Sequence, residues 1–106
     1  MEKISLEKMA ELIKSPFTPL DVFRVNNTAV RLVKIHGKYH MHKHSDQDEL
    51  FIVLRGQVHL NFEDRTVVLD EGEGFLVKKG VEHQSHAEKE ALVLMVEPYD
   101  TVPKGD

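Results

Sequence analysis

Two hydrophobic patterns follow one another along the chain, and the first predicts a helix. From Leu6 to Ile13, apolar side chains recur every three or four positions, which is the spacing of one helical face. Ser5 is a good N-cap directly before them, and Pro16 ends the pattern because proline cannot continue a helix. The sequence therefore predicts one short helix over Ser5–Lys14.

The second pattern begins after Pro19 and is typical of β-strands. Short runs rich in valine, isoleucine, leucine and phenylalanine are separated by glycine, asparagine or acidic pairs. The predicted strands are Asp21–Val25, Ala29–Ile35, Tyr39–His42, Glu49–Leu54, Gln57–Phe62, Arg65–Leu69, Gly74–Val77 and Ala91–Glu97. Short strands without a second helical pattern favour an all-β closed barrel or jelly roll. An immunoglobulin-like sandwich and an OB-type barrel are the alternatives.

Two of these strands are apolar at every position. Both faces of Leu50–Leu54 and of Ala91–Val96 must therefore be covered. One face can fill the barrel, whereas the other needs the N-terminal helix or a second subunit. Because one short helix covers little of a sheet, we expect a homodimer.

The length of 106 residues is the usual size of one domain. We expect a single domain over residues 1–106, with a helical extension at 1–18, a barrel at 19–97 and an irregular tail at 98–106. Hydrophobic residues make up 41% and charged residues 30% of the chain, a balance that supports a packed core and argues against disorder.

Charge and composition exclude several partners and site chemistries. The net charge is -4 and the basic residues are scattered, so we expect no nucleic-acid partner. No apolar run approaches the roughly 20 residues of a membrane-spanning helix, and the charged N-terminus does not resemble a signal peptide. We therefore expect a cytoplasmic protein without a membrane partner. The absence of cysteine excludes disulfides and thiolate sites, so any metal must be held by nitrogen and oxygen.

Histidine is the informative excess, with seven residues, three of which alternate at His40, His42 and His44. Alternate side chains of an extended chain point to the same side, so His42 and His44 can present two imidazoles to one ion. On a regular strand His40 would share that side and could act as a catalytic acid or base; the alternative is a rim histidine that meets only water. The histidines interpreted as structural or surface residues are His36, His59 and His86.

Glu49 and His83 complete a candidate metal site. Glu49 opens an apolar strand, and an ionised carboxylate buried there alone would cost several kcal/mol, which a bound cation offsets. His83 follows the glycine turn at Gly80, from which the chain can fold back toward the first histidine pair. Three imidazoles and one carboxylate suit one divalent transition metal ion (zinc, nickel, iron or manganese) and leave positions open for water or a small-molecule substrate.

The spacing of these residues resembles the two sequence motifs of the cupin superfamily. Gly37-x4-His42-x-His44-x4-Glu49-x6-Gly56 is similar to the first motif, one residue short, and Gly72-x5-Lys78-x-Gly80-x2-His83 is similar to the second. Lys78 and Ala87 stand where that motif usually has proline and asparagine. The resemblance implies an all-β cupin double-stranded β-helix with a short N-terminal helix. It also implies metal-ligand roles for His42, His44, Glu49 and His83.

Within the superfamily, the chain is most similar to small one-domain cupins described as mannose-6-phosphate isomerase-like. The similarity lies in Asp48-Glu49-Leu50-Phe51 and in the terminal run Glu97-Pro98…Thr101…Gly105-Asp106. The first hypothesis is a metal-dependent enzyme acting on a small molecule, because an open metal site would suit dioxygenation or isomerisation; the isomerase label of the similar proteins is not itself evidence of sugar chemistry. A non-catalytic module that binds or senses a small ligand or the metal is the alternative, and the sequence does not decide between them.

Overall fold

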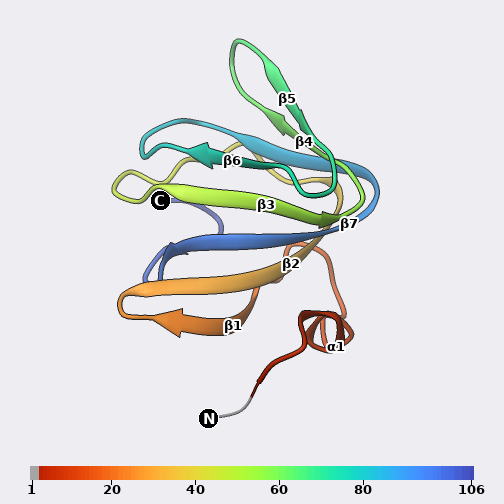
Figure 1. Ribbon diagram of the computed structural model, residues 1–106. Helices are drawn as coiled ribbons and strands as arrows, with labels where there is room; N and C mark the ends of the chain where they lie inside the picture. Colours follow the sequence, from red (N-terminus) through yellow and green to blue (C-terminus); the bar gives the residue numbers. More distant parts are fainter. Residues whose placement is uncertain (1–2) are drawn as a thin grey trace.

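The computed structural model describes residues 3–106, which form one short helix and seven strands (Figure 1). The elements are α1 (Leu6–Ala10), β1 (Leu20–Val25), β2 (Thr28–Lys38), β3 (Glu49–Arg55), β4 (Val58–Asn61), β5 (Thr66–Leu69), β6 (Gly74–Val77) and β7 (Gln84–Pro98). A mostly β structure with an N-terminal helix is what the sequence predicts. Within the described residues, no helix has the length and apolar character needed to cross a membrane.

The long strand β7 organises the fold. All strand pairs are antiparallel, in the order β1-β2-β7-β3-β6, and β4 pairs with β7 and β5 off this path. The later part of β7 lies between β2 and β3, whereas its first residues, Gln84–His86, pair with β4. β7 thus belongs to both halves of the structure and curves between them (Figure 1). Because of this curve, the inner faces of the two halves are turned toward one another.

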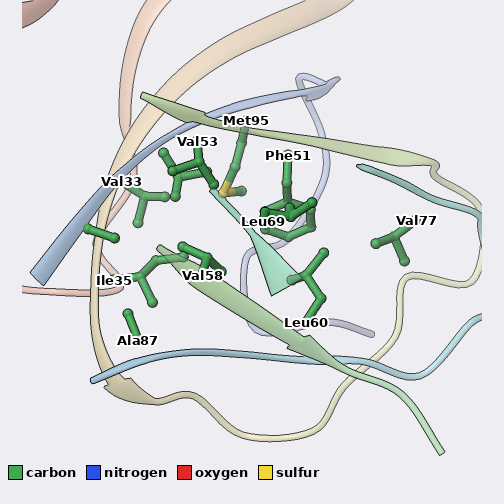
Figure 2. Packing of buried hydrophobic residues seen from close by; sticks show 12 residues of the cluster. Val33, Ile35, Phe51, Val53, Val58, Leu60, Leu69, Val77, Ala87 and Met95 are labelled. Atoms are coloured by element: carbon green, nitrogen blue, oxygen red, sulfur yellow. The ribbon is translucent and has the colours of Figure 1, made fainter. Parts of the chain in front are cut away.

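Inward-facing side chains from both halves of the sheet meet in one core (Figure 2). The buried cluster consists of Val33, Ile35, Phe51, Val53, Val58, Leu60, Leu69, Val77, Ala87, Ala91, Val93 and Met95. In β3 the buried positions alternate, and Glu49 lies on the same inward face as Phe51 and Val53. Burying each large apolar side chain contributes roughly 1.5–3 kcal/mol. This packing fixes the face on which the Glu49 carboxylate lies.

The helix begins where the sequence predicts and ends earlier. The Ser5 side chain accepts a hydrogen bond from the Lys8 N–H at 3.3 Å, which confirms Ser5 as the N-cap. The α-helix ends at Ala10 instead of Lys14, because the next amides bond three residues back, as in Ile13 N–H to Ala10 O at 3.1 Å. Ala10 and Ile13 are nevertheless buried, so the predicted apolar face is confirmed.

Two strand predictions are wrong. The predicted strand Tyr39–His42 is absent from the described structure: β2 continues to Lys38, and an isolated bridge between His42 and His83 is the β-pairing that remains in this stretch. The last strand begins at Gln84 and not at Ala91. Its early part was hidden because it contains exposed, charged residues that interrupt the apolar pattern, at Glu88, Lys89 and Glu90.

The outer face of the sheet keeps an apolar row that α1 does not cover. Strand register places Val96 beside Leu50, and Leu50 beside Leu76, on this face. The cluster around α1 includes Leu94 but neither Leu50 nor Val96, which are half-buried. The homodimer inferred from these strands stays a prediction.

Candidate metal centre

Three separate segments bring the four predicted ligands together. His42 and His44 lie in the irregular segment between β2 and β3, Glu49 opens β3, and His83 directly precedes β7. Backbone hydrogen bonds between His42 and His83, at 3.0 and 2.8 Å, join the first segment to the last. One ligand atom from each of the four residues lies within 4.8 Å of the others. The structure therefore assembles the group that the sequence spacing predicts.

Two of the imidazoles are oriented by the backbone. Nδ1 of His83 donates to the Val81 carbonyl at 2.9 Å, and Nδ1 of His42 donates to the His40 carbonyl at 3.0 Å. A neutral imidazole that donates through Nδ1 keeps a lone pair on Nε2, which is the arrangement of metal-bound histidines. Both Nδ1 atoms are thus engaged by backbone carbonyls, which leaves Nε2 as the nitrogen available to a cation; Nε2 of His83 lies 3.2 Å from Glu49 Oε1.

His44 supplies the test of whether these residues fit a metal ion. Its side chain is 3% exposed, and neither ring nitrogen has a hydrogen-bond partner within the described part of the chain. Nε2 lies 3.4 Å from Glu49 Oε2, but the two atoms do not have hydrogen-bond geometry. An unpartnered buried polar group costs about 1–3 kcal/mol. A cation between the four side chains would satisfy Nε2, so the residues present fit a metal.

The charge states of the group also suit a cation. Burial raises the pKa of Glu49, but the nearby imidazoles of His44 and His83 and the Glu97 carboxyl outweigh it and hold that pKa below its usual range. Burial lowers the pKa of His42 to about 4, and the nearby imidazoles of His83 and His44 act in the same direction. At neutral pH Glu49 is therefore anionic and His42 is neutral. Metal ligands must be in these deprotonated forms.

Behind Glu49 lies a second carboxyl group, Glu97 of β7, which is 2% exposed. Arg31 Nη1 donates to Glu97 Oε2, whereas Oε1 has no donor among the described residues. Burial and the charge of Glu49 raise the pKa of Glu97. A proton on Glu97 Oε1 would give it a hydrogen bond to the adjacent Glu49 carboxylate, so Glu97 supports this ligand as a neutral acid.

A small pocket opens directly onto the candidate ligands. Its free volume is about 30 Å³, roughly the room for one or two waters or for the end of a small molecule. His42, Glu49 and Ser85 supply the polar part of its wall. The apolar part consists of Phe17, Pro19, Val33, Ile35, Tyr39, Phe51, Met95 and Pro103. The lining drawn from the described residues contains no lysine or arginine.

Comparisons with known proteins identify the family and the fold of this chain. The family described as "Cupin domain" matches residues 30–97. The chain belongs to the cupin family. A crystal structure of a cupin-2 domain containing protein from Shewanella frigidimarina matches it with TM-score 0.87 and 33% identity, over 90% of this chain and 93% of that one. This match confirms the predicted double-stranded β-helix fold. The alternatives of an immunoglobulin-like sandwich and an OB-type barrel are thereby set aside.

Two further relatives match this cupin over most of its length. Protein NMB1881 from Neisseria meningitidis has TM-score 0.83 and 28% identity, covering 92% of this chain and 99% of that one. The uncharacterized protein YdbB of Bacillus subtilis is 35% identical over 94 residues, which is 88% of this chain and 83% of that protein. These likenesses establish the family and the fold, and the chemistry must be argued from the site.

The other histidines of this cupin lie outside the four-residue group. His40 is exposed, its ring packs against Tyr39 with centroids 4.1 Å apart, and Nε2 donates to the Lys104 carbonyl at 2.8 Å. Its catalytic role stays a prediction. His59 and His86 face one another from β4 and β7, with ring centroids 5.7 Å apart. His59 lies between the buried residues Val58 and Leu60, so its side chain is on the outer side of β4.

Sequence reasoning missed three residues of this site. Arg31 and Glu97 occupy inward-facing positions of strands whose other inward-facing positions hold buried apolar residues. A charged residue within such an apolar pattern was the sequence signal that could have identified them. Tyr39 also lines the pocket, and the sequence carried no signal of this position. Burial and then the charge of Glu49 raise the pKa of the Tyr39 phenol, so it remains a proton donor at neutral pH.

Proposed function

We propose that this cupin binds one divalent transition metal ion through His42, His44, Glu49 and His83. The observation that carries the proposal is His44, a buried imidazole with both nitrogens unpartnered beside an anionic buried carboxylate. Zinc, nickel, iron and manganese all accept this mixture of imidazole and carboxylate ligands.

We further propose that the bound ion takes part in chemistry on a small molecule. Four protein ligands leave a six-coordinate ion with open positions, and both His42 and Glu49 line the pocket from which a molecule could reach them. The ion would supply Lewis acidity or a binding position for an oxygen ligand. The chain itself supplies apolar walls that exclude water and, at Tyr39, a protonated phenol that can donate to a bound oxygen.

The pocket lining indicates the class of the small molecule. Aromatic and aliphatic side chains form most of the wall, and the lysines and arginines of the described chain lie elsewhere. A phosphate group would have no lysine or arginine to pair with in this wall. We therefore favour a compact, mainly apolar molecule with one or two oxygen donors. This favours chemistry of the dioxygenase type over isomerisation of a sugar phosphate.

A binding module without catalysis is the second candidate. Apart from the proposed ligands, the pocket wall formed by the described residues has one titratable side chain, that of Tyr39. Its raised pKa suits it to donate a proton more than to abstract one. A site with a single proton donor can hold an oxygen ligand without converting it.

Elemental analysis of protein from unsupplemented cells tests the metal proposal. We expect close to one transition metal per chain in the wild type and none in His42→Ala/His44→Ala. The double variant His59→Ala/His86→Ala removes a histidine pair on β4 and β7 and should keep the metal. Equal metal content in all three proteins would refute the assignment. Catechols and hydroxyketones are then incubated with the metal-loaded protein in air. Oxygen uptake or a new product shows turnover, whereas a compound that binds without either shows binding alone.

A further inference from the structure

The segment after β7, residues 99–106, is anchored at its beginning by Arg31. Arg31 Nη2 donates to the Tyr99 carbonyl at 2.7 Å, and Nη1 donates to the Thr101 carbonyl at 3.1 Å. Thr101 is 3% exposed, so this part of the segment belongs to the packed protein. Of the predicted irregular tail over residues 98–106, Pro98 ends β7, and residues 99–106 contain no strand but are held in place by these contacts.

The end of the same segment lies against the residues that carry two proposed ligands. The Asp106 N–H donates to the Lys43 carbonyl at 3.0 Å, and the Ser45 N–H donates to Asp106 Oδ1 at 2.8 Å. His40 Nε2 donates to the Lys104 carbonyl at 2.8 Å. Residues 104–106 thus contact the backbone of Lys43 and Ser45, on either side of His44, and the side chain of His40.

Gly105 makes this close approach possible. Its φ is +90°, which glycine adopts without strain. A Cβ at this position would lie 2.6 Å from the Lys43 carbonyl oxygen and 2.8 Å from His42 Cβ. Any side chain would therefore push the segment away from His42.

The histidine segment needs such support because regular structure does not supply it. Residues 39–48 contain no strand; besides the bridge at His42, single backbone hydrogen bonds hold them at Tyr39, whose N–H donates to the Ser85 carbonyl at 3.0 Å, and at His44, whose carbonyl accepts from the Gly80 N–H at 2.8 Å. The His44 ring has no hydrogen-bond partner of its own within the described chain, so its position follows from the backbone around it. Lys43 and Ser45, the residues on either side of His44, are the two that Asp106 holds.

We propose that residues 101–106 form a strap that positions His42 and His44 for metal binding, with Asp106 and Gly105 as its positioning residues. The inference rests on the proposed metal site and goes beyond it, because it assigns a role to residues that contact no metal. The strap limits the backbone freedom of the ligand pair before the ion binds. Loss of residues that orient metal ligands typically weakens binding by about 10–100-fold.

Titration with Co²⁺ tests the strap, because bound Co²⁺ reports both affinity and coordination geometry through its visible absorption. Asp106→Ala and Gly105→Ala should each weaken Co²⁺ binding by about tenfold or more and alter the spectrum of the bound ion. Asp106→Asn keeps an oxygen at the position of Oδ1 and should recover most of the affinity.

Gly72→Ala is the matched control for Gly105→Ala. Gly72 also has a positive φ, +83°, but a Cβ there would meet no atom within 4 Å, and it lies in the turn between β5 and β6. It should keep the affinity and the spectrum of the wild type. Thermal unfolding of the metal-free proteins shows whether each variant is folded at the temperature of the titration.

The outcomes separate the two proposals. If the wild type fails to bind Co²⁺, the metal site itself is wrong. If the wild type binds Co²⁺ while folded Asp106→Ala and Gly105→Ala match it in affinity and spectrum, the strap is overturned and the metal site stands. A loss in Gly105→Ala no larger than that in Gly72→Ala, together with equal losses in Asp106→Ala and Asp106→Asn, also overturns it.

Discussion

The carboxyl groups of Glu49 and Glu97 lie next to one another in the protein interior, and Arg31 donates to Glu97. The two carboxyls are not equivalent. Glu49 faces the imidazoles and has a lowered pKa, whereas burial and the charge of Glu49 raise the pKa of Glu97. The pair therefore shares one proton and one negative charge. In this state the proposed ligand Glu49 is an anion that is ready to bind a cation.

This arrangement predicts a pH-dependent difference between wild type and Glu97→Gln. Unfolded Glu97 loses its proton near the ordinary pKa of 4.5, whereas folded Glu97 keeps it to higher pH. The folded state then binds more protons, so this residue's contribution to stability falls as the pH rises above 4.5. Glutamine mimics the protonated form and does not titrate. In urea unfolding of metal-free protein, wild type should lose stability relative to Glu97→Gln as pH rises; a constant difference would contradict the raised pKa.

Arg31 should contribute more to stability than a surface arginine. It is 7% exposed and contacts Glu97, Asp21 and two backbone carbonyls. Removing Arg31 leaves the Glu97 carboxyl and two backbone carbonyls without their donor, at about 1–3 kcal/mol for each unpaired buried group, so Arg31→Met should destabilise the protein by about 3 kcal/mol or more. Arg31→Met/Glu97→Met should recover part of this loss, because both polar partners are gone. A double-mutant cycle by urea unfolding measures the coupling, and strictly additive losses would show that the pair is not coupled.

Much of the fold and all four proposed ligands could be predicted from the sequence because they depend on local pattern. Strand alternation set the inward face of Glu49, and motif spacing selected His83. The strand preceding Ala91 could not be predicted, since its outward residues are exposed and charged. The contacts of Arg31 with Glu97, Tyr99 and Thr101, and of Asp106 with Ser45, could not be predicted either, because each joins residues more than 60 positions apart in the chain. Such pairs are fixed by tertiary packing alone.

His42 predicts a second, opposite pH effect on the metal-free protein. Its pKa is 6.5 in an unperturbed chain and about 4 in the folded protein, chiefly because of burial. Between these values the unfolded chain binds the extra proton, so stability falls as the pH is lowered from 6.5 to about 4. His42→Gln lacks this titration, and the wild type should lose stability relative to it over that range. A difference that stays constant between pH 7 and pH 4 would show that His42 has its ordinary pKa.

The apolar row on the outer face of the sheet predicts the behaviour of the chain in solution. Register aligns Val96, Leu50 and Leu76 across β7, β3 and β6, and Leu76 is 48% exposed. We expect a second copy of the chain to cover this row in a two-fold dimer, since a self-complementary apolar face is the simplest way to bury it. Leu76→Lys should shift sedimentation from dimer to monomer. Val68→Lys, at a residue of β5 that is 45% exposed and lies outside the row, should leave the dimer intact. A wild type that sediments as a monomer at micromolar concentration would refute the dimer, and equal dissociation in both variants would place the interface elsewhere.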